Sequence, residues 1–471
     1  MKHYPYERLE ALVRRYENQL QDQAKPLFKK SELLLLADYF EFERFLSKAL
    51  EVVDYGIEQF DNSSELQVRK TRLLIYNAHL DQAMELLERK KTKGLNPSQR
   101  SLLHVEILIV QKKFSEAHAL ITALKRQYGK TRKILSDVFF LESLLYDKAG
   151  DFERSFFALE TTLGINPNHQ EAKGKLWMTM ELSKKFKPGI ILGEYLIQQD
   201  HYSCISWFNL AHAYYANFEY QKAREAFGFC IAINEDFESA YIDMAEVSLL
   251  LLMFREAADH LKVVVEKFKI KEQDILLDYG RALLKSGESR AARSVLEECK
   301  TLIDPFDPDV LFWLGETYQV ERKWAAAIEL YLSVLDFDSC WGEAHSSLGK
   351  CYFALAEFEL AEKHFREAID ISPDNLDTYV ELASYFLNIG ELAQCEQTLI
   401  QASEGVDHHV RLNYYQAAIL MLRGKENQAL ELMKDALQTD FSSHEEVYEL
   451  APELVGNKKI EDIINYYAGE Q

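Results

Sequence analysis

One short segment carries residues of the kind that bind phosphate. The run GEAHSSLGKC, Gly342 to Cys351, ends in the Gly-Lys pair of a phosphate-binding loop. Such a loop has four residues between its glycines and a Ser or Thr after the lysine, because backbone N–H groups cradle the phosphates and the hydroxyl holds Mg²⁺. Here six residues separate Gly342 from Gly349, and Cys351 follows Lys350. We therefore expect no nucleotide site in this segment.

The cysteines and one histidine pair are the other candidates for reactive or metal-binding groups. The chain has 6 Cys, none in C-x-x-C spacing, so neither a disulfide framework nor a zinc site is predicted. His408 and His409 could contact a metal, but no carboxylate or Cys lies at ligand spacing, which favours an exposed turn. Because a buried Cys packs as a small hydrophobe, we expect a structural role for Cys230, Cys299, Cys351 and Cys395.

No catalytic motif follows from the remaining residues. The chain contains neither H-E-x-x-H nor G-x-S-x-G, the spacings that place zinc ligands on one helix or a nucleophile on a sharp turn. The sequence therefore predicts a protein that is not an enzyme, with no catalytic residue, no metal and no cofactor.

The composition predicts helices throughout. Only 9 Pro and 19 Gly interrupt 471 residues, and no run of alternating β-branched residues indicates a strand. The start of the chain has no apolar segment of the secretory type, and no apolar run reaches the ~18 residues of a membrane span. We therefore expect a cytoplasmic protein that is not inserted in a membrane.

A small residue recurs along almost the whole chain at a nearly constant interval. The steps between successive positions are 34 or 35 residues, with one step of 38. Such a period indicates a repeat protein in which each unit is one pair of helices. The positions are Ala49, Ala83, Ala117, Ser155, Gly189, Ala223, Ala257, Ala292, Ala327, Ala361, Cys395 and Ala429.

The pattern around these positions resembles the tetratricopeptide repeat, whose 34 residues read W-x2-L-G-x2-Y, then Ala, Phe and Pro. The best copies are Trp207-Leu210-Ala211-Tyr214-Ala223-Phe227 and His345-Leu348-Gly349-Tyr352-Ala361-Phe365-Ala368-Pro373. The resemblance covers about residues 30–443 and implies about twelve repeats. It implies an all-α fold, a right-handed α-solenoid (superhelix) of stacked antiparallel helical hairpins, in which each unit buries its apolar face against its neighbours.

The quality of the copies predicts four regions. Residues 1–29 form an N-terminal capping helix, and 30–203 form five degenerate units of near-neutral charge. Residues 204–443 form seven well-formed, acidic units, and 444–471 form C-terminal capping helices. Within 170–203, Gly189 and Gly193 replace larger residues, which predicts loose packing or a bend.

The resemblance also implies a binding surface. In this family the first helix of each unit lines the concave face, so aromatic and charged side chains there form a groove for a partner. Exposed aromatic side chains beside charges can dominate the binding energy of such an interface. The alternative is that a neighbouring helix or a terminal segment covers these side chains, so that no partner can reach them. The groove residues predicted in this way are Phe140, Phe208, His212, Tyr215, Ile242, Glu246, Leu277, Arg281, Phe312, Glu316, Lys350, Phe353, Val380 and Asn388.

The charge distribution bears on the partner. Residues 1–200 hold 31 basic and 28 acidic residues, whereas 201–471 hold 23 and 48. An acidic surface repels a phosphate backbone, so nucleic acid is disfavoured and a basic partner with apolar anchors is favoured. We expect a non-catalytic scaffold or adaptor that binds a protein or peptide segment in the groove. Two alternatives stay open: an RNA-binding helical-repeat protein that uses the basic stretch Leu124–Lys133, or a substrate-positioning subunit of an enzyme complex.

Overall fold

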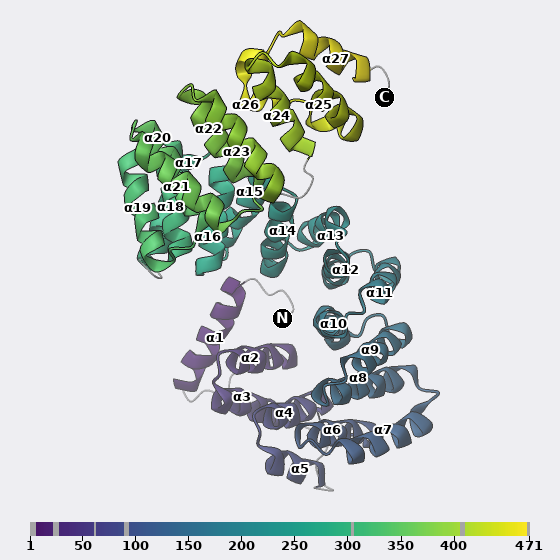
Figure 1. The fold of residues 1–471 in the computed structure, drawn as a ribbon. Coiled ribbons are helices and arrows are strands. Elements are labelled where there is room, and N and C mark those ends of the chain that lie inside the picture. Colours follow the sequence, from purple (N-terminus) through teal and green to yellow (C-terminus); the bar gives the residue numbers. More distant parts are fainter. Residues whose placement is uncertain are drawn as a thin grey trace. The chain divides into compact units, whose positions relative to one another are not determined.

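The computed structural model describes residues 6–21, 28–60, 63–88, 94–302, 306–405 and 410–468. Helix makes up 82% of these residues, and none of them lies in a strand. The chain divides into two compact units, Met1–Ala240 and Tyr241–Gln471, and the boundary falls within α14 (Glu238–Leu250). Figure 1 shows the helices following one another in pairs within each unit. The predicted all-α solenoid of helical hairpins is confirmed.

The first unit, unit 1, consists of one leading helix and six helical hairpins. Its helices are α1 (Tyr6–Gln21), α2 (Lys30–Phe42), α3 (Leu46–Gln59), α4 (Ser64–Tyr76), α5 (Leu80–Glu88), α6 (Pro97–Val110), α7 (Phe114–Tyr128), α8 (Arg132–Lys148), α9 (Phe152–Ile165), α10 (Gln170–Ser183), α11 (Phe186–Gln199), α12 (Cys204–Ala216) and α13 (Tyr220–Ile233).

The second unit, unit 2, continues the hairpins and ends in short helices. It contains most of α14, then α15 (Phe254–Glu266), α16 (Gln273–Lys285), α17 (Ser289–Leu302), α18 (Pro308–Val320), α19 (Trp324–Phe337), α20 (Gly342–Ala354), α21 (Phe358–Ile371), α22 (Leu376–Asn388), α23 (Leu392–Gly405), α24 (Val410–Leu422), α25 (Glu426–Thr439), α26 (Glu446–Leu450) and α27 (Lys458–Ala468). Single 3-10 turns lie at Phe441–Ser443 and Pro452–Leu454.

The recurring small residue occupies the same buried place in every hairpin. All twelve positions are buried, and each is the fourth residue of a second helix, from Ala49 in α3 to Ala429 in α25. A side chain no larger than that of Ser or Cys lets the two helices of a hairpin approach each other there, and larger apolar side chains fill the space on either side. In α11, Met180 from the preceding helix occupies the space beside Gly189: a Cβ on this glycine would lie 2.2 Å from the Met180 Sδ atom. The missing side chain therefore leaves no gap at this point.

The turns inside the hairpins share one backbone conformation. At each of the twelve turns, the residue five positions before the small residue has a positive φ. At Phe218, for example, φ is 63°, and the N–H of Glu219 donates to the carbonyl of Tyr214 at 2.9 Å. This contact ends a helix by satisfying one of its last free carbonyls. Only four turns use glycine, which adopts this conformation without strain, so the stacking of the helices imposes it at the others.

Prolines and capping residues mark where some first helices begin. Pro97 and Pro308 are the first residues of α6 and α18, where their missing N–H has no helical partner to lose. The side chains of Asn96 and Asp307 accept from backbone N–H groups of the first turns, at 2.8 and 3.0 Å. These local signals fix the start of the helices that carry the site described below.

Additional helices pack against the first and last hairpins. Tyr16 of α1 packs against Phe28 and Phe40, with ring centroids 5.8 and 5.9 Å apart. In unit 2, Arg411 of α24 pairs with Glu446 of α26, with 2.6 Å between Nε and Oε1. The assignment of 1–29 and 444–471 as caps, and the boundary at 203/204, stay predictions. Among the described residues, no helix has the length and apolar character needed to cross a membrane.

Candidate functional site

Nine of the fourteen predicted groove residues line three hollows, all of them formed mainly by first helices. Five of the fourteen line one hollow in unit 2, which we call the unit-2 groove: Leu277, Arg281, Phe312, Glu316 and Lys350. Lys350 also lines a smaller hollow beside it, together with Phe353, Val380 and Asn388. Phe140 lines a hollow in unit 1. The other five predicted residues line none of these three.

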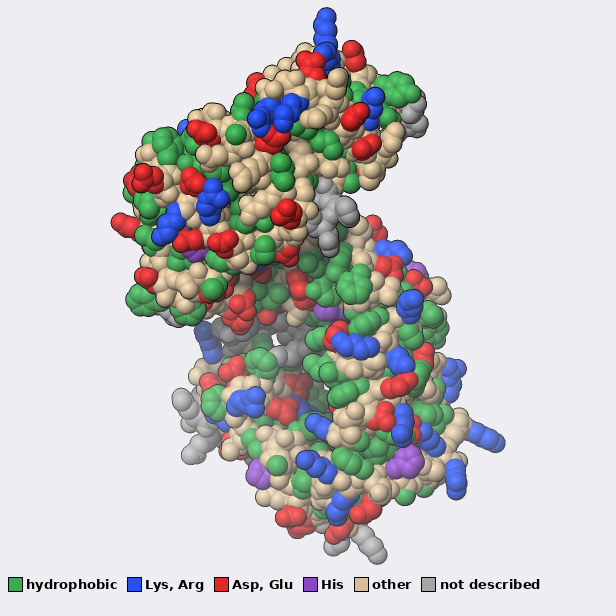
Figure 2. Space-filling view, in the orientation of Figure 1, with side chains coloured by type: hydrophobic (Ala, Val, Ile, Leu, Met, Phe, Trp, Pro, Cys, Tyr) green, Lys and Arg blue, Asp and Glu red, His purple; other side chains and the backbone are tan. Residues whose placement is uncertain are grey.

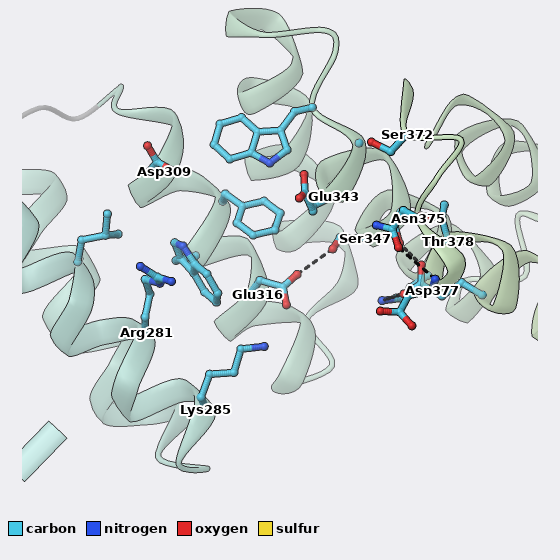
Figure 3. A pocket seen from close by; sticks show the side chains of 18 residues that line it. Arg281, Lys285, Asp309, Glu316, Glu343, Ser347, Ser372, Asn375, Asp377 and Thr378 are labelled. Carbon is cyan, nitrogen blue, oxygen red and sulfur yellow. Dashed lines mark hydrogen bonds and ion pairs between the residues drawn. The ribbon is translucent and has the colours of Figure 1, made fainter. Parts of the chain in front are cut away.

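The unit-2 groove crosses four successive hairpins. Its volume is about 590 Å³, and its lining comes from α16, α18, α20, α22 and the turns before α20 and α22. Figure 3 shows Arg281 and Lys285 on one side, Asn375, Asp377 and Thr378 on the other, and Glu316 and Ser347 between them. Because each lining helix is the first of its hairpin, the groove repeats one face of the solenoid four times.

Aromatic side chains form one wall of this groove. Phe312 stacks on Trp341 with 5.5 Å between ring centroids and contacts Trp313 edge to face. The cationic groups of Arg281 and Lys285 lie 5.0 and 5.6 Å from the ring centre of Trp313. Phe312 itself is only 8% exposed, so its ring supports the wall from behind. The half-buried rings of Trp313 and Trp341 are the aromatic surfaces that a ligand can reach.

Carboxylates are the main polar feature of the groove. Its lining includes the cations Arg281, Lys285 and Lys350 and the acids Asp309, Glu316, Glu343, Asp377 and Glu381. Glu316 is held in place, since its carboxylate accepts from the hydroxyls of Tyr331 and Ser347 at 2.7 and 2.8 Å. Glu381 pairs with Lys350 at 2.5 Å and accepts from Ser346. Partial desolvation, together with the nearby carboxylate of Asp307, raises the pKa of Asp309 above its usual value, although the side chain is exposed.

Exposure distinguishes the fixed acids from the accessible ones. Glu343 and Asp309 are exposed, and neither makes an ion pair with a described residue. Figure 2 shows acidic and basic side chains interspersed over the face in view, without a large patch of one sign. The five carboxylates and three cations of the groove are in keeping with the general acidic excess of residues 201–471.

The smaller hollow of unit 2 is partly closed by a terminal helix. It has a volume of about 310 Å³, and Glu449 and Leu450 of α26 line it opposite Phe353 and Val380. This is the covering by a terminal segment that the sequence left open as an alternative. It applies to Phe353, Val380 and Asn388, whereas no residue of α26 lines the unit-2 groove.

The hollow in unit 1 is lined by α4, α6, α8 and α10 and has a volume of about 610 Å³. At its floor, Arg72 Nη2 lies 2.9 Å from Oε1 of Glu106, a side chain that is 4% exposed. Burial raises the pKa of Glu106, and the neighbouring guanidinium acts in the opposite direction. Phe140 is buried beside this hollow and packs on the ring of His169.

The expectation of exposed aromatic anchors is wrong for three of the predicted residues: Phe140, Phe208 and Phe312 are buried. Phe208 is 5% exposed because Phe227 and Phe237 enclose its ring, at centroid distances of 5.8 and 4.8 Å. His212 stacks on Trp177, and Tyr215 packs against Tyr220. Ile242 is half-buried and Glu246 exposed.

One group of potential metal ligands was missed from the sequence. His345 of α20 and His364 and Glu367 of α21 bring three ligand atoms within 4.8 Å of one another. Both imidazoles are buried, and burial lowers the pKa of His364 to about 4. The available signal was a histidine at the Trp position of a repeat together with the H-x-x-E spacing of His364 and Glu367. The pair His408–His409 lies outside the described residues, whereas the four cysteines expected in the core are all buried.

Comparisons with known proteins agree with the repeat pattern. Family models described as tetratricopeptide repeat match residues 206–237 and 342–375. No curated protein sequence matches the chain. Repeats of this kind support a role in protein–protein interaction and belong to a fold that is generally a non-catalytic scaffold.

The chain is similar to several solved structures. One is YrrB, described as a tetratricopeptide-repeat protein with an unusual peptide-binding site, at 20% identity and TM-score 0.34, covering 40% of this chain and 95% of that one. A tetratricopeptide-repeat protein from Parabacteroides merdae is 12% identical with a TM-score of 0.44, and the match covers 56% of this chain and 99% of that one. The Cut9–Hcn1 structure is 14% identical with a TM-score of 0.38, and the match covers 86% of this chain and 89% of that one. Because these TM-scores are below 0.5, the likenesses support no inference about binding.

Proposed function

Because the chain is a tetratricopeptide-repeat protein, we propose that it is a scaffold or adaptor that binds a protein or peptide segment in the unit-2 groove. The observation that carries this proposal is the groove itself, which four successive first helices line with half-buried tryptophans and exposed acids. A segment that lies along it can contact the same face of several hairpins at once. The proposed role is non-catalytic.

The lining suggests the chemistry of the partner. Five carboxylates against three cations favour a segment with Lys or Arg, because opposite charges steer the encounter and fix the register. The rings of Trp313 and Trp341 offer surfaces for an apolar side chain or for a cation. We therefore propose a basic segment with at least one apolar anchor, and a soluble partner in the cytoplasm.

A matched pair of charge reversals tests this proposal. Peptides are first selected on the full chain from a displayed random library, and their Kd values are measured by fluorescence anisotropy. The groove variant is Asp309→Lys with Glu343→Lys, both exposed, so the fold is retained. The control is Glu329→Lys with Glu359→Lys, two exposed acids on α19 and α21 that do not line the groove and give the same change in net charge.

We expect the groove variant to weaken binding at least tenfold and the control to stay within twofold. Added salt should lower the association rate for the native chain more than for the groove variant. Equal losses in both variants would show that only the overall charge matters. No loss in either would place binding outside this groove. Salt-sensitive retention of the native chain on RNA would instead favour the RNA-binding alternative.

A further inference from the structure

Three ligand atoms converge between the two helices of the α20–α21 hairpin. The Nδ1 atoms of His345 and His364 are 2.9 Å apart. Oε2 of Glu367 lies 3.0 Å from the first and 3.3 Å from the second. His364 and Glu367 are three residues apart on α21, so they share one face of that helix. His345 faces them from α20, near the end of the hairpin that is away from its turn.

These separations match the spacing of ligands around one metal ion. Zinc binds imidazole nitrogen and carboxylate oxygen at about 2.0–2.2 Å, so two such ligands in a tetrahedral site lie roughly 3.3 Å apart. The three observed separations of 2.9, 3.0 and 3.3 Å form a nearly equilateral triangle of that size. An ion placed just above the triangle reaches all three atoms with shifts of only a few tenths of an ångström.

The proton positions also leave a place for a cation. Nε2 of His345 lies 3.2 Å from the backbone carbonyl of Ser339, which can only accept, so Nε2 carries the proton. In the neutral ring the Nδ1 atom then presents a lone pair to Oε2 of Glu367. Two acceptors at 3.0 Å repel each other unless a cation, or a proton on Nδ1 of His364, which lies 2.9 Å from one and 3.3 Å from the other, stands between them. A hydrogen bond from one imidazole nitrogen to a carbonyl is also how proteins orient a metal-binding histidine.

Neighbouring residues hold the other two ligands. The ring of Tyr352 stacks on His364 with 5.5 Å between centroids and an angle of 11° between planes. Lys363 Nζ lies 3.8 Å from Oε1 of Glu367, on the carboxylate oxygen that does not face the histidines. The side chain of Glu367 is 38% exposed, which gives an ion a route from solvent.

We propose that His345, His364 and Glu367 bind a divalent transition-metal ion, for which Zn²⁺ is the natural probe. Two imidazoles and one carboxylate suit zinc and leave one coordination position for water. The ion joins α20 to α21 at the open end of their hairpin. A proton on one of the two Nδ1 atoms is the competing occupant, and the test below distinguishes the two.

The test uses the full chain without an affinity tag, stripped of metal with a chelator and then titrated with Zn²⁺. Binding is followed by calorimetry, and the retained metal is counted by mass spectrometry after desalting. We expect one equivalent for the native chain and a rise in its melting temperature, since zinc binds the folded state. His345→Gln with His364→Gln should abolish that equivalent, and Glu367→Gln should weaken binding at least tenfold. His260→Gln, a histidine of α15 outside the cluster, should change neither value.

Two results would overturn the proposal. One is a native chain that retains no stoichiometric zinc after stripping and reloading, which would leave the proton as the occupant. The other is unchanged affinity in the double histidine variant. If that double variant fails to fold by circular dichroism, Glu367→Gln decides, because its carboxylate lies at the surface and the substitution keeps its shape. Native affinity in Glu367→Gln would then refute the three-ligand site.

Discussion

The same substitution, Gly→Ala inside a helix, should have opposite effects at two positions. At Gly315 in α18, a Cβ would lie 2.5 Å from Cε1 of Tyr331. That ring is fully buried, and its hydroxyl donates to Glu316 at 2.7 Å, so it has little freedom to move away. Overpacking of this kind costs about 1–3 kcal/mol, and we expect the upper part of that range. The helix-propensity gain of about 1 kcal/mol offsets part of it, which leaves Gly315→Ala destabilising by about 2 kcal/mol.

Gly174 in α10 is the control. A Cβ there would meet no atom within 4 Å, and the residue is exposed. Gly174→Ala therefore keeps only the propensity gain and should stabilise by about 1 kcal/mol. Long repeat arrays can unfold in steps, so the measurement is hydrogen exchange of peptides from α18–α19 and from α10, alongside urea denaturation. If Gly315→Ala slows exchange as much as Gly174→Ala does, the close approach of Tyr331 to α18 is refuted.

Five further substitutions, arranged in three tests, probe the packing. Ala361→Leu should lower the melting temperature, because the small position has no room for a larger side chain and overpacking costs ~1–3 kcal/mol. Its control, Gln394→Leu at an exposed position, should be near neutral. Equal melting temperatures for the two variants would mean that the repeat register is wrong. Phe218→Gly should stabilise by about 1 kcal/mol in urea denaturation, since φ is 63° and the ring is 78% exposed, whereas Gly390→Ala should destabilise. Phe208→Ala should cost about 3–5 kcal/mol of folding stability, and an unchanged melting temperature would show that its ring is not part of the core.

The fold could be predicted because one physical requirement recurs. Two helices can cross closely only where a side chain is small, so the interval between Ala223 and Ala257 carries the register of the whole solenoid. The turns were less predictable. Gly150 and Gly390 indicate a positive φ, but Phe218 adopts the same conformation. No local preference favours it there, and the packing of both flanking helices imposes it.

The sequence predicts which helices form the site, but not which of their side chains are exposed. The groove positions of the family, transferred to this sequence, put Leu277 and Arg281 on the correct helix. This works because the position of a residue along a helix determines which face it occupies. It does not determine exposure. Phe312 is covered by Trp341, which belongs to the next hairpin, and Phe208 by Phe237, which follows its own. Such covering depends on how successive elements stack, which no single repeat encodes.

The histidine cluster could not be predicted from the sequence either, because its residues come together only in the folded hairpin. His345 and His364 are 19 residues apart, on two helices that run in opposite directions. Their imidazoles meet because α20 and α21 pack against each other in one hairpin. A search for ligands at short spacing along the chain therefore finds His408–His409 and passes over the pair that the fold brings together.

Helix α20 connects the two proposals, since its two faces belong to different sites. Ser346 and Lys350 line the groove and hold Glu381 of α22, whereas His345 points back to α21. An ion on His345 fixes the rotation of α20 about its axis, and with it the groove wall. We therefore expect saturating zinc to change the Kd of a groove-bound peptide in the native chain, and the peptide to change zinc affinity by the same factor. Glu367→Gln should remove this coupling without touching the groove, because Glu367 lies on α21 and does not line it. Equal peptide affinities with and without zinc would show that α20 is already fixed by its packing and that the ion acts on the hairpin alone.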